Sequence, residues 1–296
     1  MSLARPPTSE PPPARAVVCQ QPPSAVSSPA VSGWAARVIL TPACRRRHRR
    51  RRYTTCVEPQ ALEFLPVLRL PLLRGEEHDC PYLPDRTAAE LFALPLGVDS
   101  GTYRRLMDLG FRRAGQVFYR PSCPGCRECA PIRVPVERFT PSRSQRRVLR
   151  RNHDLRVQIG PPVEDDRRYE LYRRYQAWQH QGRMIEGREE FAAFFCGSPI
   201  DTIEMSYWLG ERLVGVGIVD VCPGALSSVY FYSEPDFARR SLGVFSALCE
   251  MEECRRRGLA YWYVGFYIRD CRKMSYKARF RPHELLGPDG RWRQPS

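Results

Sequence analysis

The sequence has 296 residues, 43% of them hydrophobic, which is enough for one large or two modest domains with a substantial core. Its formal net charge of +15 favours a polyanionic partner, although residues 1–74 alone carry 12 Arg and 3 Glu, a net of +9. No stretch approaches the ~20 apolar residues of a membrane-spanning helix and no secretory signal is visible, so we expect neither a membrane protein nor a secreted disulfide scaffold, but a cytoplasmic protein.

Residues 1–74 are rich in Pro, Ala, Ser and Arg and show no sustained hydrophobic period. Such a segment buries too little apolar surface to fold by itself. We interpret it as a disordered leader, or as a mis-assigned leader translated upstream of the true start. The alternative is an RNA-binding arm, based on the run from Arg45 to Arg52 that only His48 interrupts.

From residue 75 onward the apolar pattern predicts helices and strands in alternation. In the first half we expect a helix over residues 100–109 ended by Gly110, strands over 111–120 and 132–136, and a basic helix or turn over 142–151. Helices over 165–179 and 189–196 follow, then an antiparallel meander over 202–209, 212–222 and 226–232. A helix over 241–257 capped by Ser241, a strand over 260–268 and the segment K-M-S-Y-K-A-R-F complete the ordered chain.

Strands, a helix that begins at a Gly-containing turn, and a further strand resemble the core of the N-acetyltransferase-like (GNAT) fold. In that fold the helix N-terminus binds a phosphate-bearing donor through free amides. Arg240 and Gly243 fit the turn that binds coenzyme A, but the bulky Phe245 does not, which indicates a different acyl donor. We expect an α/β (α+β) fold with a Cys-containing N-terminal domain over residues 75–160 and an acetyltransferase-like domain over residues 161–296.

Several motifs occur in the order of one known family. They are C-P-Y-L-P, Y-R-P-S-C-P-G-C-R-E-C-A-P-I-R, S-R-S-Q-R-R, V-D-V, V-Y-F-Y-S-E-P-D and G-F-Y-I-R-D-C-R-K-M-S-Y-K-A-R-F-R-P. Over residues 76–293 the chain resembles the aminoacyl-tRNA–protein transferases. The branch it resembles most is the bacterial aspartate/glutamate leucyltransferases, relatives of the eukaryotic arginyltransferases.

The resemblance implies that leucine passes from Leu-tRNA to the α-amine of a protein beginning with Asp or Glu, marking it for an N-degron adaptor and protease. Aminoacyl-tRNA is then a co-substrate, no cofactor is required and no membrane is involved. Because the aminoacyl ester is already activated, a carboxylate base and an oxyanion donor suffice. Three alternatives remain: an arginyl-tRNA–protein transferase, a coenzyme A-dependent acetyltransferase, and a non-catalytic RNA-binding protein with a metal knuckle.

A carboxylate within the apolar run V-G-V-G-I-V-D-V makes Asp220 our candidate for positioning or deprotonating the amine. The alternative is a strand-end residue that faces solvent. Glu234 and Asp236 are second choices, with a turn role in E-P-D as their alternative. Tyr230 and Tyr232 share a strand face and are predicted to line the leucyl pocket, unless they pack in the core.

The acceptor carboxylate needs a cation, and the sequence contains only two lysines, both in K-M-S-Y-K. We predict that Lys273 and Lys277, at i and i+4 of one helical face, bind this carboxylate with help from Arg279. For the tRNA phosphates we predict a basic surface, with a solvated basic helix as the alternative. Its residues are Arg143, Gln145, Arg146, Arg147, Arg150 and Arg151.

Three thiols lie at two-residue gaps, at Cys123, Cys126 and Cys129. This spacing occurs in iron–sulfur ligation, which needs a fourth ligand from elsewhere. The resemblance points to Cys80, because the eukaryotic relatives carry a C-G-Y-C pair there that is linked to cluster binding. Leu83 replaces the second of those cysteines, so an iron–sulfur cluster, zinc and simple thiol packing all remain open.

Overall fold

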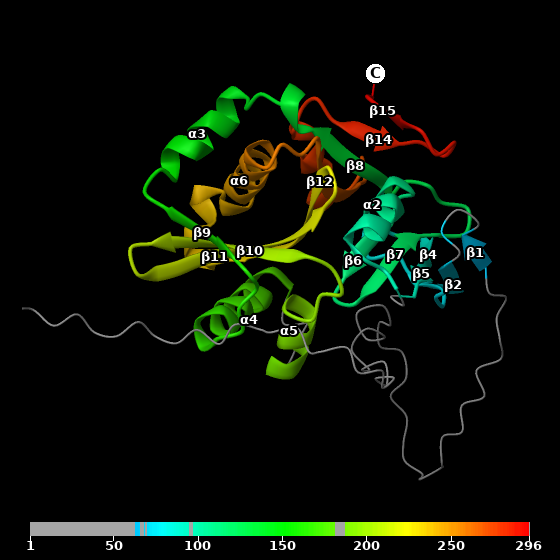
Figure 1. Ribbon diagram of the computed structural model, residues 1–296, viewed down its shortest axis with the longest axis horizontal. Coiled ribbons are helices and arrows are strands. Elements are labelled where there is room, and N and C mark those ends of the chain that lie inside the picture. Colours follow the sequence, from blue (N-terminus) through cyan, green and yellow to red (C-terminus); the bar gives the residue numbers. More distant parts are fainter. Residues whose placement is uncertain (1–62, 66–67, 69, 95–96, 181–186, 296) are drawn as a thin grey trace, which may run out of the picture.

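The computed structural model describes residues 63–65, 68, 70–94, 97–180 and 187–295. It is a mixed α/β structure with two principal sheets (Figure 1). Residues 1–62 lie outside the described residues, so the interpretation of the leader stays a prediction. Residues 70–74, which we assigned to the leader, form a strand because Leu70 and Leu72 alternate inward and are buried in the core.

The N-terminal sheet has five strands in the antiparallel order β1-β2-β5-β7-β6. Its strands are β1 (Glu63–Leu65), β2 (Leu70–Arg74), β5 (Glu90–Ala93), β6 (Arg112–Ala114) and β7 (Val117–Pro121), with a separate hairpin of β3 (His78–Asp79) and β4 (Thr87–Ala88). The strand predicted over 111–120 is a hairpin, because Gly115 adopts a φ of +59° that turns the chain.

The predicted helix over residues 100–109 is confirmed as α2 (Ser100–Asp108). The Asp99 carboxylate accepts a 2.7 Å hydrogen bond from the Thr102 amide at its start. Gly110 follows its end with a φ of +86°. Tyr103 and Leu106 bury their side chains against the N-terminal sheet and fix the helix there.

The larger sheet has eight strands in the order β15-β14-β8-β13-β12-β11-β10-β9. Their bounds are β8 (Ala130–Pro135), β9 (Arg156–Gly160), β10 (Thr202–Leu209), β11 (Arg212–Cys222), β12 (Ala225–Ser233), β13 (Tyr261–Tyr267), β14 (Glu284–Leu286) and β15 (Trp292–Arg293).

The predicted meander β10-β11-β12 is confirmed. The sequence pattern missed β9, β14 and β15, so K-M-S-Y-K-A-R-F is not the last ordered element. Strand β8 lies before residue 160 and β9 ends at Gly160, so this sheet spans our expected domain boundary.

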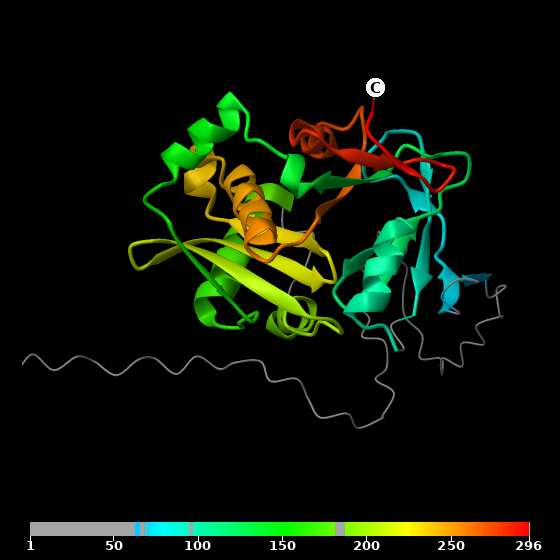
Figure 2. The ribbon, with the colours of Figure 1, turned by 45° about the horizontal axis from the view of Figure 1, so that its top comes forward.

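Helices cover both faces of the meander (Figures 1 and 2). On one face lie α3 (Arg143–Arg151) and α6 (Leu242–Arg256), and on the other α4 (Asp166–His180) and α5 (Arg188–Phe195). Short turns complete the chain as η1 (Val136–Arg138), η2 (Pro235–Arg240), α7 (Arg272–Ser275) and η3 (Tyr276–Arg279). Ser241 precedes α6 but makes no side-chain cap, because it adopts the left-handed region with φ +58°.

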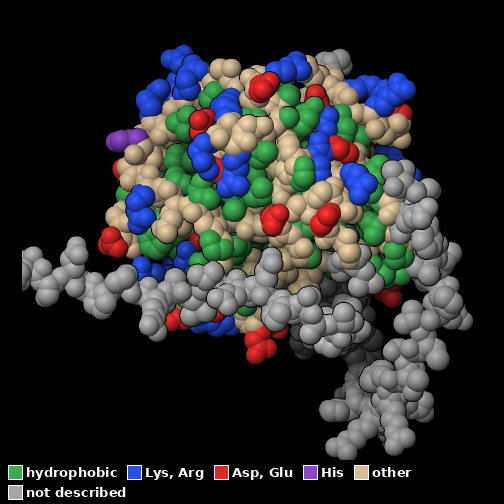
Figure 3. Space-filling view, in the orientation of Figure 1, with side chains coloured by type: hydrophobic (Ala, Val, Ile, Leu, Met, Phe, Trp, Pro, Cys, Tyr) green, Lys and Arg blue, Asp and Glu red, His purple; other side chains and the backbone are tan. Residues whose placement is uncertain are grey.

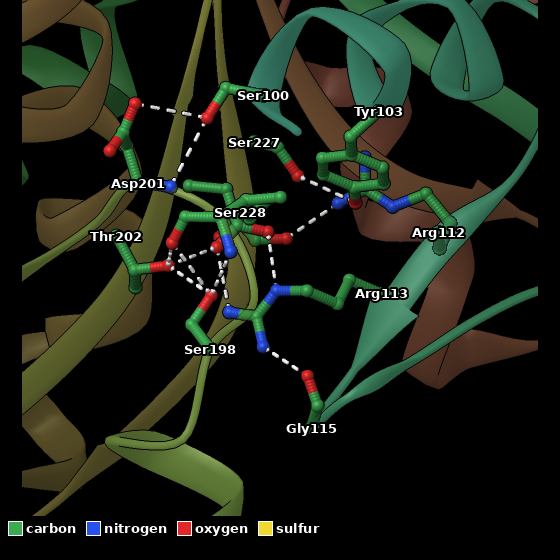
Figure 4. A network of polar contacts seen from close by, with 12 residues as sticks. Ser100, Tyr103, Arg112, Arg113, Gly115, Ser198, Asp201, Thr202, Ser227 and Ser228 are labelled. Carbon is green, nitrogen blue, oxygen red and sulfur yellow. Dashed lines mark hydrogen bonds and ion pairs between the residues drawn. The ribbon is translucent and has the colours of Figure 1, made fainter. Parts of the chain in front are cut away.

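A buried ion pair joins the N-terminal sheet to the meander. Arg113 of β6 donates from Nη2 and Nε to the two carboxylate oxygens of Asp220 on β11, at 2.6 and 2.9 Å. Both side chains are fully buried. Thr202 donates a further hydrogen bond to Asp220 at 2.9 Å, and Figure 4 shows Arg113 reaching toward Thr202 and Ser198. The pair therefore adds a buried polar link between two sheets that also share a hydrophobic cluster, in which Leu91 and Phe118 pack with Cys222 and Ala225.

Replacing Arg113 with Met should lower the free energy of unfolding by about 3–5 kcal/mol, because Asp220 would stay buried without its cation. Urea denaturation at pH 7 measures this. The matched control is the double variant Arg113→Met/Asp220→Leu, which removes both charges and should be less destabilised than the single variant. A single variant as stable as the wild type would contradict this account.

Candidate active site

Strands β12 and β13 run parallel, and their pairing ends early. Their register covers Ala225 to Ser227 against Tyr261 to Tyr263. Beyond this point β12 shifts its register against β11, so Ser228 and Tyr230 have partners in β11 while Val229 has none. The two strands diverge, and a pocket of about 310 Å³ occupies the space between them.

The pocket collects residues from five parts of the chain. Strand β12 contributes Ser228 to Phe231, and β13 contributes Trp262 and Val264. The remaining lining residues are Tyr175 of α4, Gly243, Ser246, Ala247 and Glu250 of α6, and Tyr276, Lys277 and Phe280 after α7. Most of this wall is apolar or aromatic, with one carboxylate and one amine, the composition of a pocket that orients a small acyl group.

Glu250 is the buried carboxylate of this pocket, 1% exposed. Its oxygens accept hydrogen bonds from the indole of Trp262 at 2.8 Å and the hydroxyl of Ser246 at 3.1 Å. No Lys or Arg among the described residues lies within ion-pair distance of it. Burial raises the pKa of Glu250 to about 7, against the opposing effect of these hydrogen bonds. A carboxylate with this pKa exchanges a proton readily at neutral pH.

Lys277 is the buried amine, 9% exposed. Its Nζ donates to the carbonyl of Phe266 at 2.8 Å. Gly265 adopts a φ of +95°, and a Cβ there would lie 3.3 Å from this Nζ, so glycine gives the amine its room. Burial, followed by the charge of Arg112, lowers the pKa of Lys277 to about 7. Two groups with opposite shifts toward neutrality in one pocket are typical of a catalytic site.

Asp220, our predicted base, does not line this pocket. Its carboxylate is fully buried, and both oxygens accept hydrogen bonds from Arg113, with Thr202 adding a third. Because Arg113 and Thr202 occupy both carboxylate oxygens, no room is left for an amine. These surroundings argue against the predicted role and indicate a structural one.

Glu234 and Asp236, our second choices, also lie outside the pocket lining. Glu234 is buried and accepts hydrogen bonds from Arg174 at 3.0 Å, with Arg212 at 3.2 Å. Asp236 is exposed and lies 3.8 Å from Arg212. These carboxylates hold the turn after β12, the role we gave as their alternative.

Sequence reasoning missed Glu250, although a usable signal was present. It stands in the run S-A-L-C-E-M of α6, where its neighbours are buried. The argument that selected Asp220, a carboxylate among apolar residues, applies equally to Glu250. Only the contacts separate the two, because one carboxylate meets an arginine and the other meets neutral donors.

The two tyrosines differ in position. Tyr230 lines the pocket, and its hydroxyl accepts a 2.8 Å hydrogen bond from Gln176. Tyr232 is 1% exposed and packs in an aromatic cluster, with ring centroids 5.5 Å from those of Tyr172 and Phe195. Tyr232 is therefore a core residue and does not line the pocket.

The structure separates the two lysines as well. Helix α7 ends at Ser275 and η3 follows, so Lys273 and Lys277 do not share one helical face. Lys273 is exposed and Lys277 is buried in the pocket wall, while Arg279 is exposed beside it in sequence. Of the three predicted cations, Lys277 alone lines the pocket.

Helix α3 presents the predicted basic surface. Arg143, Arg146, Arg147, Arg150 and Arg151 are all exposed. In the part of the chain that the structure describes, none of them has an acidic partner within 4.0 Å. Figure 3 shows basic side chains gathered at the upper left, where Figure 1 places α3. These five arginines are hereafter the α3 arginines.

Gln145 does not belong to that surface. It is 5% exposed and completes a capping box with Ser142 at the start of α3. Its Nε2 also donates to the carbonyl of Arg279 at 3.2 Å. Gln145 thus fixes α3 beside η3, which carries Lys277, and the prediction that it contacts phosphate is wrong for this buried position.

Cys80, Cys123, Cys126 and Cys129 are half-buried thiols around two further cavities of about 180 and 360 Å³. Burial and then the neighbouring thiols raise the pKa of Cys129 to about 12, which favours the thiol over the thiolate that metals bind. Within the described ranges no three His, Cys, Asp or Glu side chains are arranged to hold a metal ion. Metal binding by these four cysteines therefore stays a prediction.

None of the helices in the described ranges combines the length and apolar character that crossing a membrane requires.

The site and fold correspond to a class of acyl-transferring enzymes. The family described as "Arginine-tRNA-protein transferase, N terminus" matches residues 78–147, and its C-terminal counterpart matches residues 167–287. The chain is 43% identical over 222 residues to the aspartate/glutamate leucyltransferase of Marinobacter nauticus, covering 74% of this chain and 93% of that one. It is 41% identical to the enzyme of the same name from Pseudomonas putida strain W619, covering 74% and 94%.

The chain therefore belongs to the arginyl-tRNA–protein transferase family, in its aspartate/glutamate leucyltransferase branch, and is an aminoacyltransferase. The resemblance predicted from the motifs is confirmed.

Among solved structures the likenesses are remote. FemX superposes with a TM-score of 0.42 at 8% identity, covering 71% of this chain and 84% of FemX. The C-terminal domain (DUF2156) of a protein named "Putative Lysylphosphatidylglycerol Synthetase" from Agrobacterium fabrum gives a TM-score of 0.41 at 14% identity, covering 63% of this chain and 66% of that one.

The two lysines make the pKa of Lys277 directly measurable. In protein labelled with ¹³C-lysine, one Cε signal should titrate with a midpoint of about 7, because burial disfavours the ammonium form. The Lys277→Arg variant, which lacks that signal, assigns it, and Lys273→Arg is the matched control. A Lys277 signal that titrates only above pH 9 would contradict the buried placement.

Proposed function

We propose that this enzyme transfers leucine from Leu-tRNA to the α-amine of proteins that begin with Asp or Glu, using the pocket between β12 and β13 as its acyl site. The observation that carries the proposal is Glu250, a buried carboxylate with a pKa of about 7 and neutral partners in that pocket. The names of the relatives support the substrates. The new N-terminal leucine would mark the product for an N-degron adaptor and protease in the cytoplasm.

The meander, α6 and the parallel β13 form the arrangement expected of an N-acetyltransferase-like fold. The divergence of β12 from β13 supports this assignment, because it opens a slot for the acyl donor beside the N-terminal half of α6. Phe245 packs into the core against Tyr207, with ring centroids 5.8 Å apart. A bulky core residue there supports an acyl donor other than coenzyme A.

The acceptor α-amine, whose ordinary pKa is about 7.7–8.0, first loses its ammonium proton to solvent and becomes a neutral nucleophile. Glu250, whose pKa is about 7, takes the second proton, which the nitrogen loses as it attacks the ester carbonyl. The amine nitrogen bonds to the leucyl carbonyl carbon, and the ester C–O bond breaks. The proton passes to the ribose oxygen of the departing tRNA. The ammonium form of Lys277 at the pocket wall stabilises the tetrahedral oxyanion.

The pocket wall favours leucine over arginine as the transferred residue. Tyr230, Phe231, Val264 and Phe280 offer apolar and aromatic surface to an aliphatic side chain. Among the described residues, Glu250 is the one carboxylate of the lining, and the chemistry already uses it. An arginyl side chain would need a further acidic partner to replace its hydration.

The α3 arginines are the proposed surface for the tRNA. Gln145 binds the backbone at Arg279, and η3 leads from there to Lys277 at the pocket. Phosphates of the acceptor stem on α3 would thus leave the aminoacylated 3′ end near the acyl site. This continuity between a basic surface and an acyl pocket supports aminoacyl-tRNA as the co-substrate.

Glu250→Gln should lower kcat at least about 10²-fold, because the amide cannot accept the amine proton. The assay follows radiolabelled leucine from Leu-tRNA to a peptide that begins with Asp, with Arg-tRNA and acetyl coenzyme A as alternative donors. For the wild type, kcat should pass through a maximum near pH 7, since the reaction needs the deprotonated carboxylate of Glu250 and the ammonium form of Lys277, each with a pKa of about 7. The fall on the acidic side should be absent from the residual activity of the variant.

The matched control is Glu253→Gln, one turn further along α6. Glu253 is buried outside the pocket lining and pairs with Arg256 and Arg257. Near-normal turnover of Glu250→Gln, or an equal loss in both variants, would refute Glu250 as the base. Efficient transfer from acetyl coenzyme A would refute the proposed donor.

The double variant Arg143→Ala/Arg147→Ala should raise KM for Leu-tRNA and flatten its salt dependence. Each lost phosphate contact should reduce the slope of log affinity against log salt by roughly 0.7–0.9. KM for the acceptor peptide should stay unchanged. Arg291→Ala, an exposed arginine outside α3, is the control. An unchanged salt slope in the double variant would exclude these two side chains as phosphate contacts.

A further inference from the structure

Arg112 is a buried arginine without an acidic partner. It is 6% exposed, and its Nη2 donates to the carbonyl of Ser228 at 2.6 Å. Its other hydrogen-bond contact is with the sulfur of Met107 at 3.9 Å. Within the ranges that the structure describes, no Asp or Glu oxygen lies within 4.0 Å of its guanidinium. Figure 4 shows Arg112 extending from β6 toward Ser228.

Other buried arginines in this chain are paired. Arg113 binds Asp220, Arg168 binds Glu204 at 2.7 Å, and Arg133 binds Glu284 at 2.8 Å. Removing a guanidinium from water without a counter-ion is costly, and one carbonyl offsets only part of that cost. The sequence retains the charge at Arg112 all the same, which indicates that a ligand supplies the missing anion.

The position of Arg112 identifies where this ligand lies. Its contact Ser228 lines the acyl pocket, and the Ser228 hydroxyl lies 3.5 Å from the Glu250 carboxylate. On its other side Arg112 pairs in register with Tyr119, which lines the cavity of about 180 Å³ near the thiols. Phe266 lines that same cavity, and its carbonyl holds Lys277. Arg112 itself lines neither cavity, but Ser228, which it contacts, lines the acyl pocket, and Tyr119, its register partner, lines the second cavity.

The pKa values of Lys277 and Glu250 agree with this placement of Arg112. The positive charge of Arg112 contributes to lowering the pKa of Lys277 and opposes the burial that raises the pKa of Glu250. Both groups of the acyl pocket thus sense the guanidinium. An anion that binds Arg112 lies close to the amine that Glu250 deprotonates.

We propose that Arg112 binds the side-chain carboxylate of the N-terminal Asp or Glu of the acceptor protein. This inference rests on the proposed function and makes Arg112 a specificity-determining residue for it. In an N-terminal Asp or Glu the carboxylate lies within a few bonds of the α-amine, so one residue reaches both Glu250 and Arg112. The planar guanidinium presents parallel N–H donors that suit a carboxylate. Arg112 thereby takes the role that the sequence suggested for Lys273 and Lys277, with help from Arg279.

The test compares peptides that differ only in an N-terminal Asp or Asn, with Leu-tRNA as donor. The wild type should favour Asp in kcat/KM by at least about tenfold, the effect of a charge-assisted hydrogen bond. In Arg112→Gln this preference should fall toward one through loss of activity on the Asp peptide. KM for Leu-tRNA should change less than about twofold, because the donor does not contact Arg112 in this scheme.

Arg255→Gln is the matched control, since Arg255 also donates to backbone carbonyls, those of Val136 and Phe139. It lies near the end of α6, outside the pocket lining, and should leave the preference for Asp unchanged whatever stability it loses. Arg112→Lys keeps the charge but loses the planar fork, so its preference should lie between those of the wild type and Arg112→Gln. This variant decides the question if Arg112→Gln does not fold.

The outcomes separate this inference from the proposed function. Equal losses on the Asp and Asn peptides, with the wild-type preference retained in both Arg112 variants, would show a purely structural role. A rise in KM confined to Leu-tRNA would show a phosphate contact and would also overturn the inference. Failure of the wild type to transfer leucine to either peptide would overturn the proposed function itself.

Discussion

The early end of the parallel pairing between β12 and β13 is the constraint on which the site depends. Three register pairs hold the strands together, and the bulge at Val229 then turns β12 away from β13. A continuous ladder would fill this space with backbone hydrogen bonds. Because the ladder stops, side chains from α6 and from the segment after α7 enter the gap and form a pocket. The same strands belong to a sheet of eight, which keeps the gap open.

The low polarity inside that pocket shifts the pKa values of its two ionisable groups, Glu250 and Lys277. Burial disfavours a charge on either group, so the pKa of the acid rises and the pKa of the amine falls until both are near 7. The hydrogen bonds from Trp262 and Ser246 are neutral and orient the Glu250 carboxylate without a permanent counter-ion. A carboxylate in such surroundings remains available for proton transfer.

Two adjacent arginines show how neighbouring positions on one short strand diverge in role. Arg113 meets Asp220 and closes a buried pair that joins the two sheets. Within the described residues, Arg112 meets a thioether and the carbonyl of Ser228, a residue that lines the acyl pocket. Their side chains are chemically identical, so the difference arises entirely from which strand each one reaches. The paired arginine stabilises the fold, and the arginine without an acidic partner is suited to bind an anion.

The sequence by itself determined the family, the meander, α2, α6 and the basic character of α3. These features depend on local periodicity, on glycine at helix ends and on motifs that are contiguous in the chain. Lys277 and Tyr230 were also found in this way. The short strands β9, β14 and β15 escaped detection, because two to five residues carry too little pattern.

The tertiary structure decided which buried carboxylate is available for proton transfer. Asp220 and Glu250 look alike in sequence, each an acid among apolar residues, yet Arg113 occupies the first and neutral donors surround the second. It also decided that Lys273 is exposed while Lys277 is buried, and that Gln145 caps a helix. The physical reason is that ionisation and access depend on partners supplied by distant parts of the chain, which local sequence does not encode.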